Sequence, residues 1–261
     1  MFNNTFFEFG YNVIFEPEYI AILDYAKSNG YQLPKRNQNF KNNKKIKKLK
    51  SEGIFTELDI LYNFKQHSGL SDFSKINWVN PGVYNATQSN VINHPVLESD
   101  KGFKGGTNSY LLTDYIPSIN SNKAQLEDVT VFFKTYDEIQ GVVAGTRNGS
   151  GNNFVFRKFN PSGNNVANFH GSSSGDGLNV FADNKHVIHS KFGLTHSYYV
   201  DGTLTTTGTY SSTFFSTVPL TIFAWNLNGT ISQNFEGGIE YFALGSSFVG
   251  NKAKELREIF Q

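Results

Sequence analysis

The chain has 261 residues, a formal net charge of +1 and no cysteine, and its aromatic residues (15%) nearly match its charged residues (17%) in number. The missing cysteines exclude disulfide scaffolds, cysteine zinc sites, iron–sulfur clusters and thiol catalysis, and the near-neutral charge argues against nucleic-acid binding by the whole surface. No apolar run approaches the roughly 18 residues that a membrane span needs. Abundant aromatic residues, together with 24 glycines, predict a mainly β chain with many turns.

Residues 1–16 contain a strand-like alternation. Apolar side chains occupy every second position at Phe7, Phe9, Tyr11, Val13 and Phe15. Such alternation places these five side chains on one face of a β-strand. The strand either joins the protein's own sheet or acts as an anchor arm, a docking strand added to a neighbouring subunit during assembly.

Three short helices are predicted within residues 17–68. The first begins at Pro17 and ends before Gly30, the second covers 36–51, and a third follows Gly53. Their apolar stripes are, in order, Tyr19, Ile20, Leu23 and Ala26; Phe40, Ile46 and Leu49; and Ile54, Leu58, Leu61 and Tyr62. We expect these helices to pack on each other or across one end of a β domain.

The second predicted helix carries a run of positive charge. Positions 35–50 hold no acidic residue, and their cations are Lys35, Arg36, Lys41, Lys44, Lys45, Lys47, Lys48 and Lys50. A basic helix of this kind can bind phosphate groups. We interpret it instead as a solvated outer face, because no Arg-rich recognition face and no interleaved aromatic residues accompany it.

Residues 69–261 are predicted to form an antiparallel β-sandwich closed by a short helix. Strand-like runs separated by turn clusters recur about every ten residues. The runs are 129–136, 140–145, 153–159, 165–169, 178–181, 186–191, 196–200, 203–207, 220–225 and 238–245. Asp201-Gly202 predicts a type I′ hairpin, because both residues readily adopt positive φ. Ala253, Leu256 and Phe260 share one face of the closing helix.

The sequence gives no positive case for catalysis or metal binding. His186 and His189 would point to opposite faces of a strand, so they cannot converge on one ion. Glu236 and Glu240 are the one carboxylate pair that could share a strand face for glycoside hydrolysis. The nucleophile elbow of hydrolases and the glycine motifs that bind phosphate both lie at a turn between a strand and a helix. The sequence has neither motif in such a position. We therefore expect a protein that is not an enzyme and that uses neither a metal nor a cofactor.

With catalysis and metal binding unsupported, the function that remains to be considered is sugar binding at the surface. Aromatic faces stack on the apolar side of a pyranose, and Asn and Asp side chains hydrogen-bond its hydroxyl groups. The candidate glycan contacts are Tyr198, Asp201, Tyr210, Trp225, Asn226 and Asn228. The alternative is that these aromatic residues belong to the core and that the Asn-Gly pair forms a turn.

Segments near the end of the chain resemble concanavalin-like or laminin-G-like jelly rolls. Residues 196–204 (HSYYVDGTL) resemble the Asp-Gly hairpin of those folds, and residues 219–229 and 235–248 resemble their last strands. The resemblance implies a jelly-roll sandwich followed by a helix. Glucanases of that superfamily carry a Glu-x-Asp-x-x-Glu strand, which this chain lacks, so hydrolysis is not implied.

Nearly the whole chain is similar to virion proteins of phages that infect Bacteroidetes-type hosts. The similarity is carried by AILDYAKSNGYQLP (21–34), KLKSEGIFTELD (48–59), INWVNP (76–81), HPVL (94–97), GFKGG (102–106) and SYLLTD (109–114). It implies a tail-fibre, spike or capsid-surface module that is assembled in the bacterial cytoplasm, a reducing compartment that suits a chain without cysteine.

The implied function is attachment to host-envelope polysaccharide by non-covalent binding, with many copies offsetting a low affinity per site. The alternatives are a purely architectural virion component, such as a spike base, capsid decoration or tail protein, and a polysaccharide depolymerase. Expected partners are other virion proteins, copies of the same chain (a trimer is one option) and host polysaccharide, but not nucleic acid. The expected organisation is an anchor arm (1–16), a helical unit (17–68) and a β-sandwich (69–261).

Overall fold

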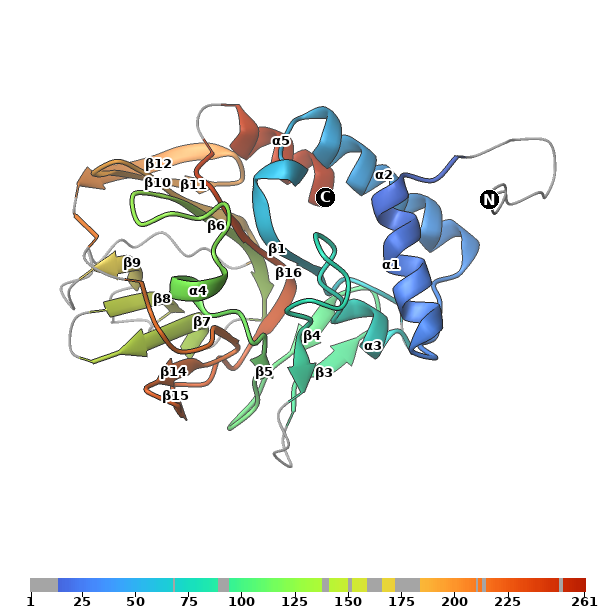
Figure 1. The fold of residues 1–261 in the computed structure, drawn as a ribbon, viewed down its shortest axis with the longest axis horizontal. Coiled ribbons are helices and arrows are strands. Elements are labelled where there is room, and N and C mark those ends of the chain that lie inside the picture. Colours follow the sequence, from blue (N-terminus) through green and yellow to red (C-terminus); the bar gives the residue numbers. More distant parts are fainter. Residues whose placement is uncertain are drawn as a thin grey trace.

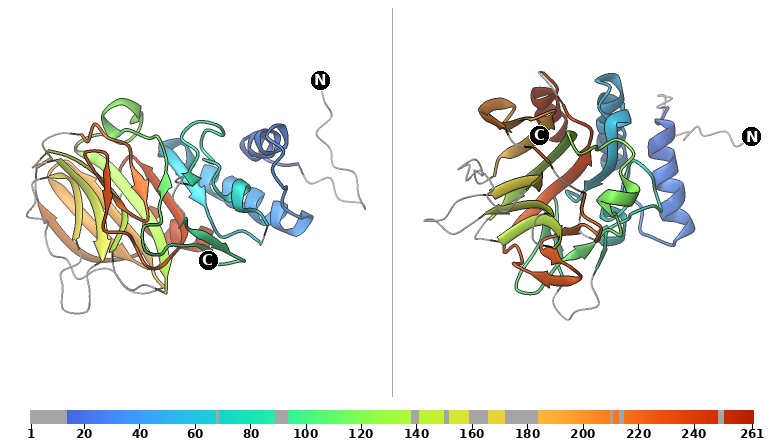
Figure 2. Two further views of the ribbon diagram at one scale, coloured as in Figure 1. Left: turned by 90° about the horizontal axis from the view of Figure 1, so that it is seen from below. Right: turned by 60° about the vertical axis from the view of Figure 1, so that its left-hand side comes forward.

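The chain folds into a two-sheet β-sandwich with a layer of helices against one of the sheets (Figures 1 and 2). The computed structural model describes residues 14–67, 69–88, 94–137, 141–149, 152–158, 166–171, 184–209, 211–212, 215–248 and 251–261. The backbone alone is described for residues 152, 153, 157, 158 and 166–171. The mainly β, jelly-roll-like sandwich predicted from the sequence is confirmed.

Sheet A is the central layer. Its strand order is β12-β11-β10-β6-β16-β4-β3, and β1 pairs with β16 along the same edge as β4. The strands are β1 (Leu58–Asn63), β3 (Val96–Glu98), β4 (Gly102–Lys104), β6 (Asp128–Tyr136), β10 (His186–Phe192), β11 (Thr195–Val200), β12 (Thr203–Thr209) and β16 (Gly238–Gly245). Every residue of β16 is buried, because the middle of sheet A is covered on both faces.

Sheet B is the outer layer of the sandwich. Its strand order is β15-β14-β7-β13-β5-β2, and β8 lies between β7 and β9. The strands are β2 (Thr87–Gln88), β5 (Leu111–Leu112), β7 (Gly141–Asn148), β8 (Asn152–Lys158), β9 (Val166–Gly171), β13 (Thr221–Ile222), β14 (Trp225–Leu227) and β15 (Thr230–Ser232). β14 runs parallel to β7, whereas the neighbouring pairs are antiparallel.

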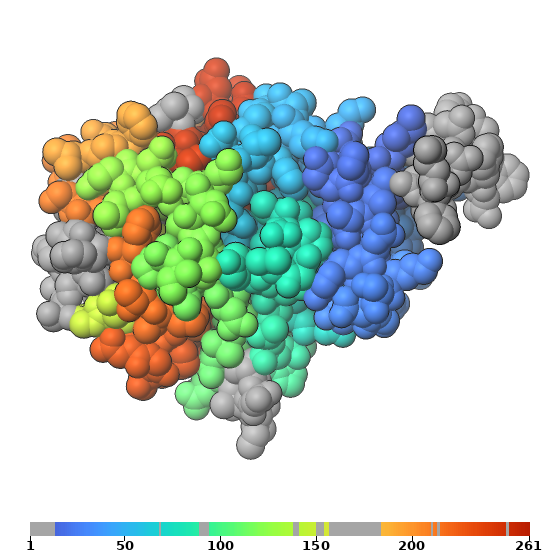
Figure 3. All heavy atoms as spheres, in the orientation of Figure 1, coloured from blue at the N-terminus to red at the C-terminus, as the bar shows by residue number. Residues whose placement is uncertain are grey.

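Three helices, α1 (Pro17–Ser28), α2 (Arg36–Ser51) and α5 (Lys252–Phe260), form the layer on the outer side of sheet A, and α1 and α2 lie close to their predicted bounds. Shorter turns are η1 (Phe55–Glu57), α3 (Ser71–Ser74) and α4 (Pro117–Asn120). One hydrophobic core fills the space between the sheets, and a second lies between sheet A and the helices. In the space-filling view, α1 (blue) lies directly against the segment that follows β1 (teal) (Figure 3). No helix of the described residues is both long and apolar enough to cross a membrane.

The third helix predicted from the sequence is wrong, because residues 58–63 form strand β1. All six residues are buried. Ile60 and Tyr62 belong to the core between the sheets, whereas Leu58 and Leu61 belong to the core beneath the helices. A strand buried on both faces lacks polar alternation, so periodicity did not distinguish it from a helix. Part of the predicted helical unit therefore lies inside sheet A.

Most predicted strands are confirmed to within a few residues. The run 220–225 is an exception, because Phe223 has a φ of 69° and separates β13 from β14. Asp201 and Gly202 have φ values of 50° and 77°, which confirms the positive-φ hairpin predicted between β11 and β12. The predicted run 178–181 lies outside the described residues.

The predicted docking strand is described only at its end. Phe7, Phe9, Tyr11 and Val13 lie outside the described residues. Phe15 is half-buried in an irregular segment before α1. Its ring packs edge-on against Tyr19 in α1 and Phe40 in α2, with centroid separations of 5.5 and 5.8 Å. Phe15 therefore contacts the helices of its own chain.

A buried carboxylate in β1 fixes the loop that leads into β6. Asp59 is 8% exposed and accepts hydrogen bonds from the backbone N–H groups of Asn122, Lys123 and Ala124, each at 2.9 Å. The Tyr115 hydroxyl donates to the same carboxylate at 3.1 Å. These four donors replace the water that a buried charge loses, so they hold the loop against sheet A.

Replacing Asp59 with Ala is expected to lower the free energy of unfolding by about 3 kcal/mol, because three buried N–H groups lose their acceptor. Chemical denaturation followed by circular dichroism measures this loss. Asp72→Ala is the matched control, since the carboxylate of Asp72 is exposed and pairs with Lys75 at 2.8 Å, and an ion pair with an exposed partner contributes about 1 kcal/mol or less. Equal losses in the two variants would contradict the role given to Asp59.

Candidate functional site

The structure does not bring the predicted glycan contacts together. Tyr198 and Asp201 lie on the β11–β12 hairpin of sheet A, whereas Trp225, Asn226 and Asn228 lie at the β14–β15 hairpin of sheet B. Asp201 is occupied by an ion pair with Lys185 at 2.7 Å. The set therefore divides between two different layers of the protein.

The two described aromatic residues of that set are inside the protein. Tyr198 is fully buried in the core between the sheets and stacks on His189 with a centroid distance of 3.9 Å. Trp225 is 6% exposed, and the guanidinium of Arg147 lies 5.5 Å from its ring. Neither ring offers an open face to a sugar. Tyr210 lies outside the described residues.

The amides beside Trp225 build their own loop. Asn226 donates from Nδ2 to the carbonyl of Pro219 at 2.9 Å and accepts the N–H of Gly229 at 2.8 Å. Asn228 accepts the N–H of Gly149 at 3.0 Å through Oδ1. These contacts fit the turn interpretation of the Asn-Gly pair, because the amide groups serve the backbone of the loop.

Glu236 and Glu240 have separate partners. The two carboxylate oxygens of Glu240 are held by Lys65 at 2.9 Å and by Lys134 at 2.7 Å. Glu236 accepts a hydrogen bond from Thr107 at 3.2 Å. Glycoside hydrolysis needs one carboxyl group free to donate a proton and a second one facing it across the bond. The geometry of this pair does not provide that arrangement.

The histidines of β10 lie on opposite faces of sheet A, as predicted. His186 hydrogen-bonds the Tyr241 hydroxyl on the helical side, whereas His189 contacts Tyr198 in the core between the sheets. Burial lowers the pKa of His186 from 6.5 to about 4, so its ring is neutral at physiological pH. In the described part of the chain, no three His, Asp or Glu residues are placed to hold a metal ion.

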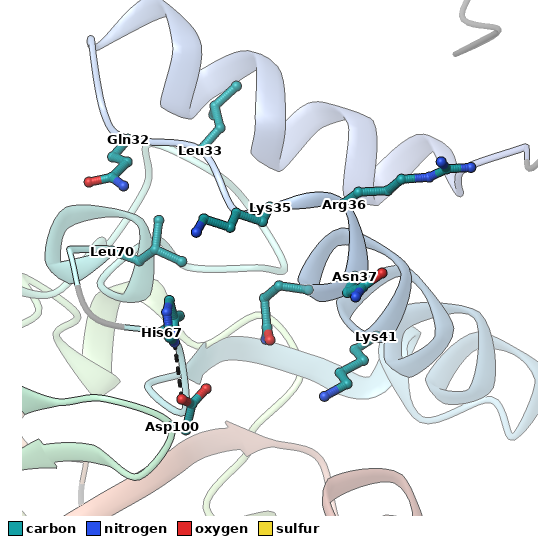
Figure 4. Close-up of a pocket in the computed structure, with 10 residues that line it drawn as sticks. Gln32, Leu33, Lys35, Arg36, Asn37, Lys41, His67, Leu70 and Asp100 are labelled. Carbon is teal, nitrogen blue, oxygen red and sulfur yellow. Dashed lines mark hydrogen bonds and ion pairs between the residues drawn. The ribbon is translucent and has the colours of Figure 1, made fainter. Parts of the chain in front are cut away.

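An open cavity of about 460 Å³ lies at the start of α2 (Figure 4). Amide and ammonium side chains line it at Gln32, Lys35, Asn37, Gln38 and Lys41, and Leu33 and Leu70 add apolar surface. Figure 4 shows Lys35, Lys41 and the His67–Asp100 pair around a common space, whereas Arg36 extends away from it. The cavity therefore offers a ligand ammonium donors, amide donors and acceptors, and apolar surface.

The His67–Asp100 pair forms one wall of this cavity. His67 Nδ1 lies 3.0 Å from the Oδ2 atom of Asp100. The backbone N–H of Asp100 donates to the carbonyl of Gln66 at 2.8 Å, which joins the two loops. Hydrogen bonds from His67 and from Ser99 lower the pKa of Asp100, so this group lines the cavity as a carboxylate.

A second cavity, of about 480 Å³, continues along α2 toward α5. Gln38, Lys41 and Asp100 line both cavities, so the two adjoin, and together they are here named the α2 groove. Beyond these shared residues, the groove is lined by Lys44, Lys45, Lys48, Lys65, Glu258 and Ile259. The positively charged helix identified in the sequence thus forms the wall of a groove.

Positive charge in the α2 groove is only partly balanced. α2 begins without a side-chain cap and without an acidic residue in its first turn. Lys48 pairs with Glu258 at 3.2 Å, but no ion pair within the described residues involves Lys41, Lys44 or Lys45. The lysine charges favour a negatively charged ligand, and at the start of α2 the helix dipole acts in the same direction.

Lys45 lies deepest among these lysines. Its half-buried side chain places Nζ 5.0 Å from the ring centroid of Phe260. Burial, aided by the nearby charge of Lys65, lowers the pKa of Lys45 from 10.5 to about 8. The groove therefore gains positive charge as the pH falls through about 8.

Another cavity, of about 420 Å³, combines aromatic and polar side chains. Tyr25 and Tyr31 line it and meet edge to face, with a centroid distance of 6.2 Å. Asp72 and Asn85 supply hydrogen-bonding groups. This tyrosine cavity has the lining expected for a neutral sugar, and it is the second location to test.

Comparisons with known proteins show similarity of fold only. No family model matches the chain, and no curated protein matches it in sequence. The binding domain of botulinum neurotoxin serotype D is similar in structure, with a TM-score of 0.48 and 10% identity over 79% of this chain and 52% of that one. A mutant of Trypanosoma rangeli sialidase displaying trans-sialidase activity gives a TM-score of 0.49 and 14% identity over 84% of this chain and 38% of that one.

Domain 4 of AbnA, an extracellular arabinanase from Geobacillus stearothermophilus, solved with arabinotriose, gives a TM-score of 0.46 and 11% identity over 78% of this chain and 98% of that one. The present chain thus spans about half of the neurotoxin chain and less of the sialidase chain. Similarity of this degree carries no argument about ligands, so the function is argued from the residues of this chain.

The amine of Lys45 is expected to react at lower pH than an ordinary lysine, with half-maximal acetylation near pH 8. Competitive acetylation followed by peptide mass spectrometry, repeated from neutral to alkaline pH, measures this midpoint. Lys65→Gln removes a neighbouring positive charge, so it should move the midpoint upward. A wild-type midpoint at the ordinary lysine value of about 10.4 would contradict the burial argument.

Proposed function

We propose that this protein is a virion surface protein that binds host-envelope polysaccharide non-covalently through the α2 groove. The supporting observation is the lining of the groove, where amide, ammonium and apolar side chains border an open cavity of about 460 Å³. Sugar hydroxyl and acid groups accept hydrogen bonds from such donors, and Leu33 and Leu70 offer apolar surface to the carbon face of a ring. The virion role rests on the sequence resemblance described above.

Binding without hydrolysis is part of the proposal. Both carboxylate oxygens of Glu240 are engaged by lysines, so Glu240 is not free to act with Glu236 as a pair of hydrolytic carboxyl groups. Asp100 in the groove is kept as a carboxylate by its hydrogen bond to His67. A carboxylate of lowered pKa suits an acceptor for sugar hydroxyls better than a proton donor.

A single groove of this size is expected to bind weakly, because its polar groups must give up water when a sugar enters. Many copies on one particle raise the overall strength of attachment without any new contact. The proposed partners are therefore other virion proteins, further copies of this chain and the host polysaccharide.

Lys41→Ala is expected to weaken binding of envelope polysaccharide about tenfold, which corresponds to about 1.4 kcal/mol, because Lys41 lines both cavities of the groove. Fluorescence anisotropy with labelled fragments of polysaccharide from Bacteroidetes-type bacteria measures the affinity. Lys47→Ala is the control, since Lys47 is exposed on the same helix but lines neither cavity. Tyr31→Ala tests the tyrosine cavity in the same assay.

Three results would overturn the proposal. A loss of binding in Tyr31→Ala with full binding in Lys41→Ala would place the site in the tyrosine cavity. Absence of binding by the wild type, combined with failed particle assembly when the protein is removed, would favour the architectural role. Release of reducing ends from the polysaccharide would favour a depolymerase.

A further inference from the structure

We infer that the ligand of the α2 groove is a linear acidic polysaccharide that lies along α2 and occupies both cavities at once. This inference rests on the proposed function and adds the charge and the extended form of the ligand to it. Three features of the groove carry it: the boundary that its two cavities share, the spacing of its lysines, and a described lining that contains no Phe, Tyr or Trp.

The first feature is that the two cavities adjoin. The two cavities, of about 460 and 480 Å³, share Gln38, Lys41 and Asp100 at their boundary. Lys35 lines only the cavity at the start of α2, and Lys44 lines only the one toward α5. A small ligand would fill one cavity, whereas a chain of sugars can pass from one to the other over the shared residues.

The second feature is the arrangement of positive charge. Lys41, Lys44, Lys45 and Lys48 stand at positions i, i+3, i+4 and i+7, so they form one stripe along two turns of the helix. Successive turns are about 5.4 Å apart. A polymer that repeats an acid group at intervals of this order meets a new lysine with each repeat.

The net positive charge of the lining also favours an acidic ligand. Lys48 pairs with Glu258 and Lys65 with Glu240, and Arg36 extends away from the cavity. The remaining charges of the lining are those of four lysines, Lys35, Lys41, Lys44 and Lys45, and of Asp100. A neutral sugar would leave the unpaired lysines without a counter-charge, whereas a polyanion places one beside each of them. Acid groups on the ligand would also keep Lys45 protonated, because a nearby negative charge raises the pKa of an amine.

The third feature separates polysaccharide from nucleic acid, the other extended polyanion. Among the described residues that line the groove, none is Phe, Tyr or Trp. Single-stranded nucleic acid binds proteins largely through stacking of its bases on aromatic side chains. Gln32, Asn37 and Gln38 instead supply amides, which pair with hydroxyl groups. The lining therefore favours an acidic sugar chain.

The experiment compares oligouronates of two, four and eight residues with the carboxyl-reduced form of the eight-residue chain. We expect the eight-residue oligouronate to bind the whole protein at least ten times more tightly than the two-residue one, because only the longer chain reaches both cavities. The reduced chain, which keeps the length but loses the charge, should bind at least ten times more weakly. Binding should also weaken roughly tenfold between low and moderate salt.

Two charge reversals test whether the cavities act as one. Lys35→Glu and Lys44→Glu each change one cavity only, and each should weaken binding of the eight-residue oligouronate by tenfold or more. If a single cavity holds the ligand, only one of them will have this effect, and the inference of an extended site fails. Lys47→Glu introduces the same charge change on the same helix outside the groove and should leave binding unchanged.

Failure of this inference can be told apart from failure of the proposed function. Equal binding of the reduced and the acidic chains, with the effect of Lys41→Ala retained, would overturn the acidic ligand but leave polysaccharide binding intact. Absence of binding to every sugar chain, including the envelope fragments, would overturn both. Tighter binding of a twelve-nucleotide single strand than of the eight-residue oligouronate would overturn the choice of polysaccharide.

Discussion

A cluster of buried amides holds α2 on the rest of the protein. Ile46 and Leu49 are the fully buried apolar residues of this helix, and Asn42 and Asn43 are buried beside them. Asn42 donates to Gln66 at 3.2 Å, and Gln38 donates to Asn42 at 3.1 Å. A helix with so little apolar surface gains limited stability from hydrophobic burial, so these hydrogen bonds determine where it lies.

Because hydrogen bonds are directional, the amide cluster also determines where the lysines of α2 lie. Apolar packing tolerates some rotation of a helix, but an amide network fixes which side faces inward. Asn43 also accepts the backbone N–H of Glu16 at 2.7 Å, which ties the start of α1 to the same helix. With this side turned inward, Lys41, Lys44 and Lys45 are held along the groove that α2 forms with α5 and with the loops of His67 and Asp100.

Sequence patterns predicted the parts of the fold that have a helical period or clear boundaries. The period marks α2, the Asp-Gly pair marks the hairpin, and the run of β16 begins and ends at glycines, Gly238 and Gly245. β1 is also buried on both faces, but no glycine bounds it, so its apolar run instead predicted a helix. The amide side of α2 was missed for a related reason, since Asn42 and Asn43 are polar residues in a buried position.

The candidate site was harder to predict. The sequence drew attention to Trp225 and Asn226, whose residue types suit sugar binding, but their side chains are used inside the protein. The positive run of α2 was visible, yet its interpretation as a solvated face left out the other wall of the groove. That wall comes from His67, Asp100 and α5, which are distant in sequence from α2, and no local pattern links them.

The position of β1 determines how the two layers of the protein unfold. β1 follows α2 in the chain, pairs with β16 in the middle of sheet A, and contributes side chains to both hydrophobic cores. Separating the helices from the sandwich would therefore expose both cores together, and the two layers should behave as one cooperative unit. The amide protons of β1 and β16 should accordingly exchange with solvent only through global unfolding, at the slowest rates in the protein.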